Sequence, residues 1–296
     1  MPIPQPGVFA QGTRSHRHLE FDLRPGQTPD VVLEALGNLR QPSVSAGGAN
    51  IVVGFGARLW RDLVGPAAAN LVAEFPEIEG VPSTPHDVWI WTHGTGDDVL
   101  FDVALAVKAH LDLVAVVASD VSGFVYHDSR DLTGFIDGTE NPAVEEAYDV
   151  ATIDDGQSGA GGSFALAQRW IHDLAGFHAL DEREQEGIIG RTKSDSTELA
   201  DDVKPDTAHI ARVVIEDSNG DEIEIYRRSV PYGTATEHGL FFVAFSADPD
   251  RFSKMLGRMF GASDDGMHDR LTEFSRPVSG AYYFVPSLDQ LGDALG

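Results

Sequence analysis

Cysteine is absent from the 296 residues of the chain. Without thiols the protein can form no disulfide, zinc–thiolate site or iron–sulfur cluster, and it has no cysteine nucleophile. A cofactor cannot be attached covalently through a CxxCH motif either. A bound metal would therefore need ligands other than thiolate, and the eleven histidines of the chain are candidates.

Positive charge is scarce. Lysine and arginine together number 21 against 47 aspartates and glutamates, which gives a formal net charge of −26, and only four residues are lysines. A surface of this charge repels nucleic acids and anionic membranes. We therefore expect neither as a partner, and we interpret the charge mainly as a source of solubility.

Long apolar runs are also missing. No window of about 18 apolar residues occurs, which is the length a membrane-spanning helix needs. The N-terminal stretch MPIPQPGVFAQ lacks the basic start and apolar run of a secretory signal. We therefore expect a cytoplasmic protein with no membrane span.

The chain does contain a regular alternation of strands and helices. Hydrophobic residues make up 42% of it, including 16 phenylalanines, which allows a sizeable core. Period-2 and period-3.6 patterns predict the elements of the first half at 17–24 (strand), 28–39 (helix), 50–60 (strand, turn and helix start), 86–94 (strand), 97–113 (helix) and 121–128 (strand). In the second half they predict 163–174 (strand), 181–190 (helix), 209–217 and 222–230 (strands joined by an Asn-Gly turn), 239–248 (strand), 249–261 (helix) and 281–288 (strand).

The order strand-helix-strand-strand-helix-strand thus occurs twice. This split βαβ plan predicts an α+β protein made of two ferredoxin-like domains with antiparallel sheets. We place the N-terminal domain at residues 1–150 and the C-terminal domain at 151–296, because the polar, glycine-rich stretch 154–162 separates the two patterns.

Residues 134–142 read GFIDGTENP and do not resemble core sequence. Gly134 and Gly138 predict turn dihedrals and a close approach of the backbone to a ligand, and Pro142 ends the segment. Asp137 has two interpretations, a turn or capping residue and a catalytic carboxylate. We interpret Glu140 and Asn141 as turn and cap residues.

Three stretches together carry a resemblance to a known family: GFIDGTENP, AHIARV (208–213) and YRRSVPYG (226–233). In this order, on a duplicated ferredoxin-like chain, they resemble the dye-decolorizing peroxidase family of haem enzymes, and the compact build is similar to its bacterial B-type branch. The resemblance implies non-covalent haem b held mainly by the second domain. It also implies reduction of hydrogen peroxide and oxidation of dyes, phenols or similar one-electron donors through a ferryl intermediate.

The resemblance also implies roles for single residues. Asp137 matches the distal aspartate, Arg227 the distal arginine and His209 the proximal iron ligand, and Ser229 falls where the family has a polar distal residue. These types suit the chemistry, because a carboxylate can accept and return a proton while an arginine stabilises the charge that leaves with the far oxygen. From the alternating pattern we expect His209 to open a strand.

Two further residues complete the expected cofactor site. The resemblance implies that Asp269 hydrogen-bonds the proximal histidine, an arrangement that makes the imidazole a stronger donor to iron. Glu273, four residues later, is the alternative partner. Arg191 resembles a contact for a haem propionate. Arg228 should point to the opposite face of its strand from Arg227, and we interpret it as a surface or salt-bridge residue.

Two other functions compete with a peroxidase. One is a protein that binds, stores or releases haem or iron, with peroxidase activity as a by-product; the other is a cofactor-free ferredoxin-like binding module. We expect a homo-oligomer. The C-terminal sequence SLDQLGDALG shows no flexible linker followed by a targeting peptide, so loading into an encapsulin shell is not expected.

Overall fold

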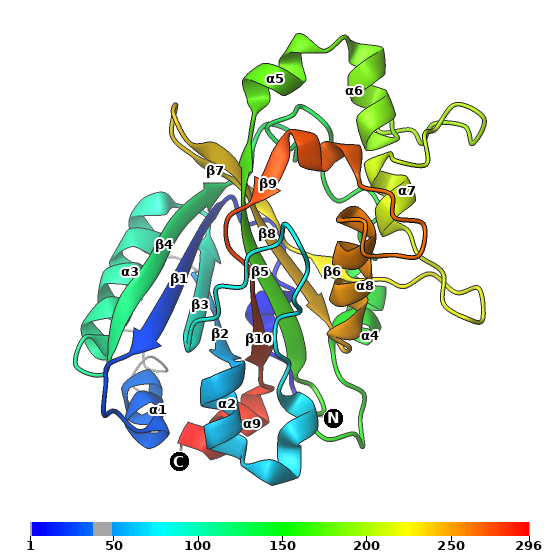
Figure 1. Cartoon of the computed structure of the whole chain (residues 1–296). Coiled ribbons are helices and arrows are strands. Elements are labelled where there is room, and N and C mark those ends of the chain that lie inside the picture. The colour runs from blue at the N-terminus through cyan, green and yellow to red at the C-terminus, as the bar shows by residue number, and fades with distance from the viewer. Residues whose placement is uncertain (1, 38–48, 296) are drawn as a thin grey trace.

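The computed structural model describes residues 2–37 and 49–295. Its strands form one continuous antiparallel sheet, shown with the surrounding helices in Figure 1. The strands of the first half are β1 (Ser15–Leu23), β2 (Asn50–Gly56), β3 (Val88–Gly94) and β4 (Ala115–Phe124). Those of the second half are β5 (Ser163–His172), β6 (Tyr226–Arg227), β7 (Val230–Gly233), β8 (His238–Ser246), β9 (Ser275–Pro277) and β10 (Ala281–Val285).

The two halves repeat one strand order. The strand order is β4-β1-β3-β2 in the first half and β10-β5-β8-β7 in the second. The two middle strands are therefore β1 and β3 in the first half and β5 and β8 in the second. This is the predicted duplicated ferredoxin-like α+β fold. The β2–β10 and β4–β7 pairings join the halves, and since β5 also pairs with β8, the sheet closes into a ring.

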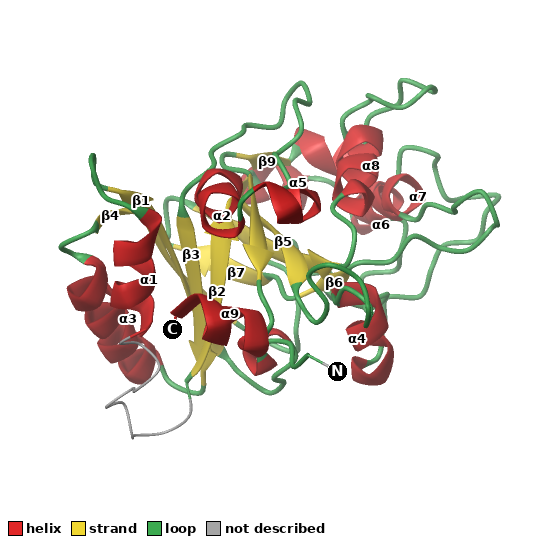
Figure 2. Ribbon diagram, turned by 90° about the horizontal axis from the view of Figure 1, so that it is seen from below, coloured by secondary structure: helices red, strands yellow, loops and turns green. Residues whose placement is uncertain are grey.

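Helices cover the outside of this ring. They are α1 (Pro29–Gly37), α2 (Ala57–Val64), α3 (Asp97–Leu111), α4 (Val144–Ala151), α5 (Leu174–Ala179), α6 (Glu182–Ile189), α7 (His209–Val213), α8 (Asp250–Met259) and α9 (Leu288–Leu295). Figures 1 and 2 both place α7 and α8 on the side of the sheet away from α1 and α3. None of the helices within the described ranges has the length and apolar character needed to cross a bilayer.

Alternate residues of each strand pack on different faces. On β3, Val88 and Ile90 join the core under the helices, whereas Trp89 and Trp91 join a second cluster with β8 and β10 inside the ring. Both tryptophans are fully buried, as expected for core residues. The sheet is therefore apolar on both faces, and a cavity outside the ring has to form where a helix stands away from it.

The hairpin predicted from strands at 209–217 and 222–230 is wrong, and of its second strand only the two residues of β6 and the first residue of β7 form. Residues 209–217 were expected to be a strand, but His209 opens the short helix α7, and only an isolated Glu216–Glu222 bridge remains of the predicted hairpin. Short alternating runs do not distinguish a strand from a helix. Here a long-range contact decides, because buried Arg212 donates to Arg258 O and pairs with Asp265. The end of the helix predicted at 28–39 lies outside the described residues.

Candidate active site

Two cavities adjoin each other, one beside the second half of the ring and the other between both halves. The first, which we call the apolar cavity, lies between the outer face of β5 and β8 and helices α7 and α8. Its apolar walls include Leu166, Trp170, Leu240, Phe242 and Met255. The second, which we call the arginine cavity, is lined by Arg14, Arg130, Arg227 and Arg228 among other residues. Asp137, Gly138 and Arg227 line both cavities.

The GFIDGTENP loop carries Asp137 to the boundary between these cavities. Gly134 and Gly138 have φ values of 94° and 80°, so the backbone takes the turn conformations predicted for them. Asp137 N donates to Ser129 O at 2.9 Å, and the Arg130 guanidinium donates to Gly134 O at 2.8 Å. The loop is therefore held by its own backbone and by one arginine.

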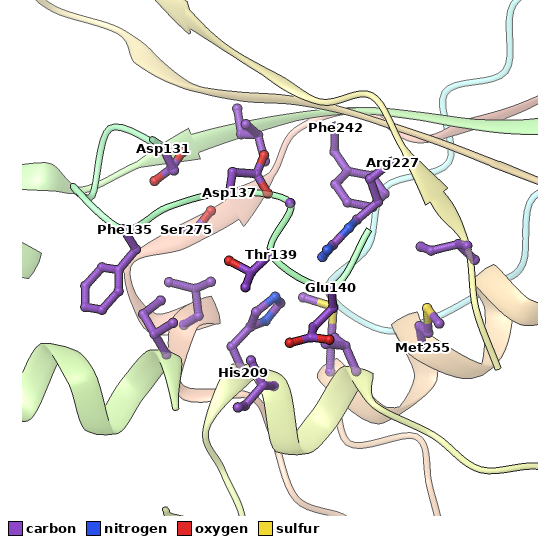
Figure 3. Close-up of a pocket in the computed structure, with 18 of the residues that line it drawn as sticks. Asp131, Phe135, Asp137, Thr139, Glu140, His209, Arg227, Phe242, Met255 and Ser275 are labelled. Atoms are coloured by element: carbon purple, nitrogen blue, oxygen red, sulfur yellow. The ribbon is translucent and has the colours of Figure 1, made fainter. Parts of the chain in front are cut away.

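The Asp137 carboxyl lies in a partly desolvated position. Burial raises the pKa of Asp137 above its ordinary value, because removing water disfavours the ionised form, while the positive charge of Arg227 opposes part of that rise. A carboxyl group with this balance can accept a proton and release it again. Figure 3 shows Asp137 and Arg227 on one side of the apolar cavity and the His209 ring on the other.

The backbone of Arg227 is fixed by a side chain of the same loop. Asn141 Nδ2 donates to Arg227 O at 3.0 Å, and Arg227 N donates to Asn141 Oδ1 at 2.8 Å. Asn141 N in turn donates to Gly138 O at 3.0 Å. Asn141 thus connects the loop that carries Asp137 to Arg227, which lies 86 positions after Asn141 in the sequence.

Sequence reasoning missed this contact because it treated Asn141 as a turn residue. A carboxamide side chain has one donor and one acceptor group, so it can pair with a strand as a neighbouring peptide group does. The Asn itself was therefore the only sequence signal for such a contact. The guanidinium of Arg227 points into the cavity (Figure 3). It makes no hydrogen bond or ion pair with any residue in the described part of the chain.

His209 is held from behind by a buried carboxylate. Its Nδ1 lies 2.6 Å from Asp269 Oδ2, and Asp269 is completely buried. Asp269 Oδ1 also accepts from Leu271 N at 2.8 Å. Since the carboxylate accepts, Nδ1 carries the ring proton and Nε2 is left as a free lone pair on the side that lines the apolar cavity.

The same geometry decides between the two partners considered for His209. Asp269 precedes a short 3-10 helix (Arg270–Glu273) as its N-cap, and Glu273 at the far end is exposed and lies 3.7 Å from Arg270. Glu273 is therefore not the hydrogen-bond partner. A spacing of four residues would place both carboxylates on one face of an α-helix, but Asp269 lies before the helix and the segment is a 3-10 turn.

The remaining expected site residues lie nearby in different surroundings. Arg191 lines the apolar cavity, pairs with Glu140 and donates to Ser196 O at 2.6 Å. Its Nη2 is also 3.5 Å from Glu198. Ser229 lines the arginine cavity beside Arg227, and its hydroxyl accepts from Val243 N at 3.2 Å.

The expectation that Arg228 is a surface residue is wrong. Its guanidinium donates to Val8 O at 2.6 Å and Ala10 O at 2.7 Å, and it lies 5.2 Å from the centre of the Trp91 ring. Burial lowers the pKa of Arg228. The side chain does leave the strand on a different side from Arg227, but that side faces the interior and an N-terminal segment that sequence periodicity could not place there.

The donor set of the apolar cavity fits a haem. One imidazole presents a free nitrogen, its partner is anionic, the walls are apolar, and a carboxylate and an unpaired guanidinium lie across the space. At the rim, Arg191 already faces two carboxylates, so a propionate would compete with Glu140. The fold and this arrangement define a haem-dependent oxidoreductase.

Comparisons with known proteins agree with this class. Residues 21–125 match the family model "Dyp-type peroxidase, N-terminal" and residues 128–290 match "Dyp-type peroxidase, C-terminal". The dye-decolorizing peroxidase of Rhodococcus erythropolis is 37% identical over 98% of this chain and 89% of its own length. The chain belongs to the Dyp-type peroxidase family.

Solved structures extend the match to the whole fold. A DypB variant from Rhodococcus jostii RHA1, in complex with heme, is 32% identical with a TM-score of 0.88 and covers 95% of this chain and 96% of its own. The encapsulated DyP-type peroxidase from Mycobacterium smegmatis is 34% identical with a TM-score of 0.88 and covers 99% of this chain and 98% of its own. DypB among the neighbours agrees with the B-type branch.

Proposed function

We propose that this peroxidase holds non-covalent haem b through His209, reduces hydrogen peroxide, and oxidises dyes, phenols or similar one-electron donors. The observation that carries the proposal is the opposition of two polar pairs across one apolar cavity. His209 and Asp269 lie on one side, and Asp137 and Arg227 lie on the other.

The bound haem would supply an iron that binds peroxide and exchanges electrons. His209 would bind it through Nε2, and Asp269 would keep the proton on Nδ1 and the ring in orientation. Arg191 would contact a propionate after giving up part of its pairing with Glu140. The apolar walls exclude water, which strengthens every electrostatic interaction in the cavity.

On the opposite side, Asp137 would accept the proton of the near peroxide oxygen and return it to the far one. Arg227 would stabilise the charge that develops on the departing oxygen without losing its own proton. Asn141 would keep these two groups at a fixed separation, and Ser229 would contribute a hydroxyl beside Arg227. We rank Arg227 above Asp137, because water can partly replace a proton acceptor.

The direct test compares two histidine substitutions in haem-loaded protein. His209→Ala should lose most bound haem and the peroxide-dependent oxidation of a neutral phenol. His110→Ala, on the exposed face of α3, is the control and should retain both. Normal haem content in His209→Ala would contradict the assignment of the ligand. Haem binding without peroxide-dependent oxidation in the wild-type protein would instead favour a haem-handling protein.

Other parts of the proposal concern organisation in the cell. We infer a cytoplasmic homo-oligomer with domains at 1–150 and 151–296. The encapsulated Mycobacterium smegmatis relative makes shell loading a question for this chain too. Co-expression with an encapsulin followed by purification of shells would test whether this chain is loaded.

A further inference from the structure

The arginine cavity differs in charge from the rest of the molecule. Four arginines line it, Asp137 is the single carboxylate among its described lining residues, and its volume is about 450 Å³. The whole chain, by contrast, has a net charge of −26. Hydrogen peroxide is neutral, so its entry alone does not account for this concentration of positive charge.

Two of the four arginines are fixed by the protein itself. Arg130 donates to the carbonyls of Gly134 and Lys193 and pairs with Asp128, and Arg228 donates to Val8 O and Ala10 O. These two shape the wall and contribute charge. They have few donors left for a ligand.

The other two arginines are available. Within residues 2–37 and 49–295, the guanidinium groups of Arg14 and Arg227 make no hydrogen bond or ion pair. Arg14 is exposed, whereas Arg227 is half-buried and its charge acts on Asp137. A guanidinium fork matches the two oxygens of a carboxylate, and two unpaired forks lining one cavity can act on the same anion.

The remaining walls restrict the anion. Asp137, when ionised, repels an anion beside Arg227, and it repels a dianion such as phosphate more strongly than a monoanion. The lining is mainly polar, and Val125, Tyr126, Val230 and Pro231 supply a smaller apolar part of the wall, against which the body of an organic anion can lie. The volume falls within the range of roughly 300–1,000 Å³ that small-molecule sites occupy.

We infer that the arginine cavity is a binding site for a small aromatic monocarboxylate, which Arg14 and Arg227 hold beside Asp137. The ligand's carboxylate then occupies a guanidinium needed at the peroxide step. This consequence rests on the proposed peroxidase function, whereas the binding itself does not.

The binding test uses benzoate and its neutral isostere benzamide with haem-loaded protein, followed by calorimetric titration in low salt. Benzoate should bind, and benzamide should bind far more weakly. Arg14→Gln should raise the Kd for benzoate roughly tenfold, because a charge-assisted pair is lost. Arg24→Gln makes the same change in net charge at an exposed arginine outside the cavity and should leave the Kd unchanged. No benzoate binding, equal binding of benzamide, or equal effects of the two substitutions would each overturn the proposal.

A kinetic test locates the ligand independently. Benzoate should raise the apparent KM for peroxide while leaving kcat unchanged, because both need Arg227. Inhibition that lowers kcat with KM unchanged would place benzoate elsewhere and overturn the site. If the protein proves inactive with peroxide, the titrations still decide whether benzoate binds through Arg14, so failure of the function and failure of the site are distinguishable.

Discussion

The two sides of the apolar cavity differ in how completely their polar atoms are paired. On the His209 side, Asp269 is fully buried and both its oxygens accept hydrogen bonds, so the imidazole has one orientation and one free nitrogen. On the Asp137 side, the backbone of Arg227 is fixed by Asn141, but its guanidinium has no partner among the described residues. One side is thus ordered by hydrogen bonds and the other presents a charge without a partner, which is the contrast that the proposed binding of haem and peroxide requires.

Among the substitutions that test this contrast, Arg227→Ala should have the largest effect on the rate of reaction with peroxide. Removing a charge that acts only in the transition state should slow the spectral change after mixing with peroxide by about 10²–10³-fold, with haem content retained. Stopped-flow absorption measures this rate. Asp137→Ala should lose less, since water can carry part of the proton transfer. A much greater loss in Asp137→Ala than in Arg227→Ala would reverse the ranking.

A smaller effect is expected from Asn141→Ala. Without its two hydrogen bonds to Arg227, the arginine backbone can move relative to Asp137, and the same stopped-flow rate should fall about tenfold. Haem content and the ferric spectrum should stay normal, because His209 is untouched. Asn219→Ala in an exposed turn is the matched control. A normal rate in Asn141→Ala would show that the strand alone positions Arg227.

The pH profile tests the proton-transfer role of Asp137. Asp137 must be ionised to accept a proton, and burial raises its pKa, so the rate with a neutral phenol should fall on the acid side at a pH above the ordinary value of 3.8. Below the raised pKa the carboxyl is protonated and the rate is lost. Asp137→Asn should remove this pH dependence from the residual rate. An acid limb that persists unchanged would assign it to another group.

The smallest effect concerns anionic dyes at the surface. The net charge of −26 repels sulfonated dyes at neutral pH, so their turnover should be best at acid pH, and added salt should reduce the difference because screening acts over about 10 Å at 0.1 M. A neutral phenol should respond little to salt. A dye optimum at or above neutral pH, or a dye profile unaffected by salt, would contradict the repulsion argument.

Sequence patterns predicted most of the fold, because strands such as β1, β3 and β5 are long runs of strand-forming residues and α3 has a long apolar repeat at helical spacing. They could not predict that the halves close into a ring. That closure depends on pairings as short as Gly123 with Tyr232 and Phe284 with Phe55, which leave no periodic pattern. The strand predicted at His209 failed for a related reason, since tertiary contacts of Arg212 decide the local structure.

The site residues divide in the same way, into those that sequence motifs identified and those that needed the structure. The motif stretches supplied Asp137, His209 and Arg227, and the choice between Asp269 and Glu273 needed the turn geometry around residue 269. The roles of Asn141 and Arg228 depend on contacts 86 and 220 positions away, which no local pattern encodes.

The most direct test of the contrast between the two sides is one absorption experiment on haem-loaded wild-type, His209→Ala and Arg227→Ala proteins, before and after one equivalent of hydrogen peroxide. The account predicts that Arg227→Ala keeps the wild-type ferric spectrum but hardly responds to peroxide on the wild-type time scale, while His209→Ala already differs before peroxide is added. A wild-type ferric spectrum in His209→Ala, together with an altered one in Arg227→Ala, would contradict it.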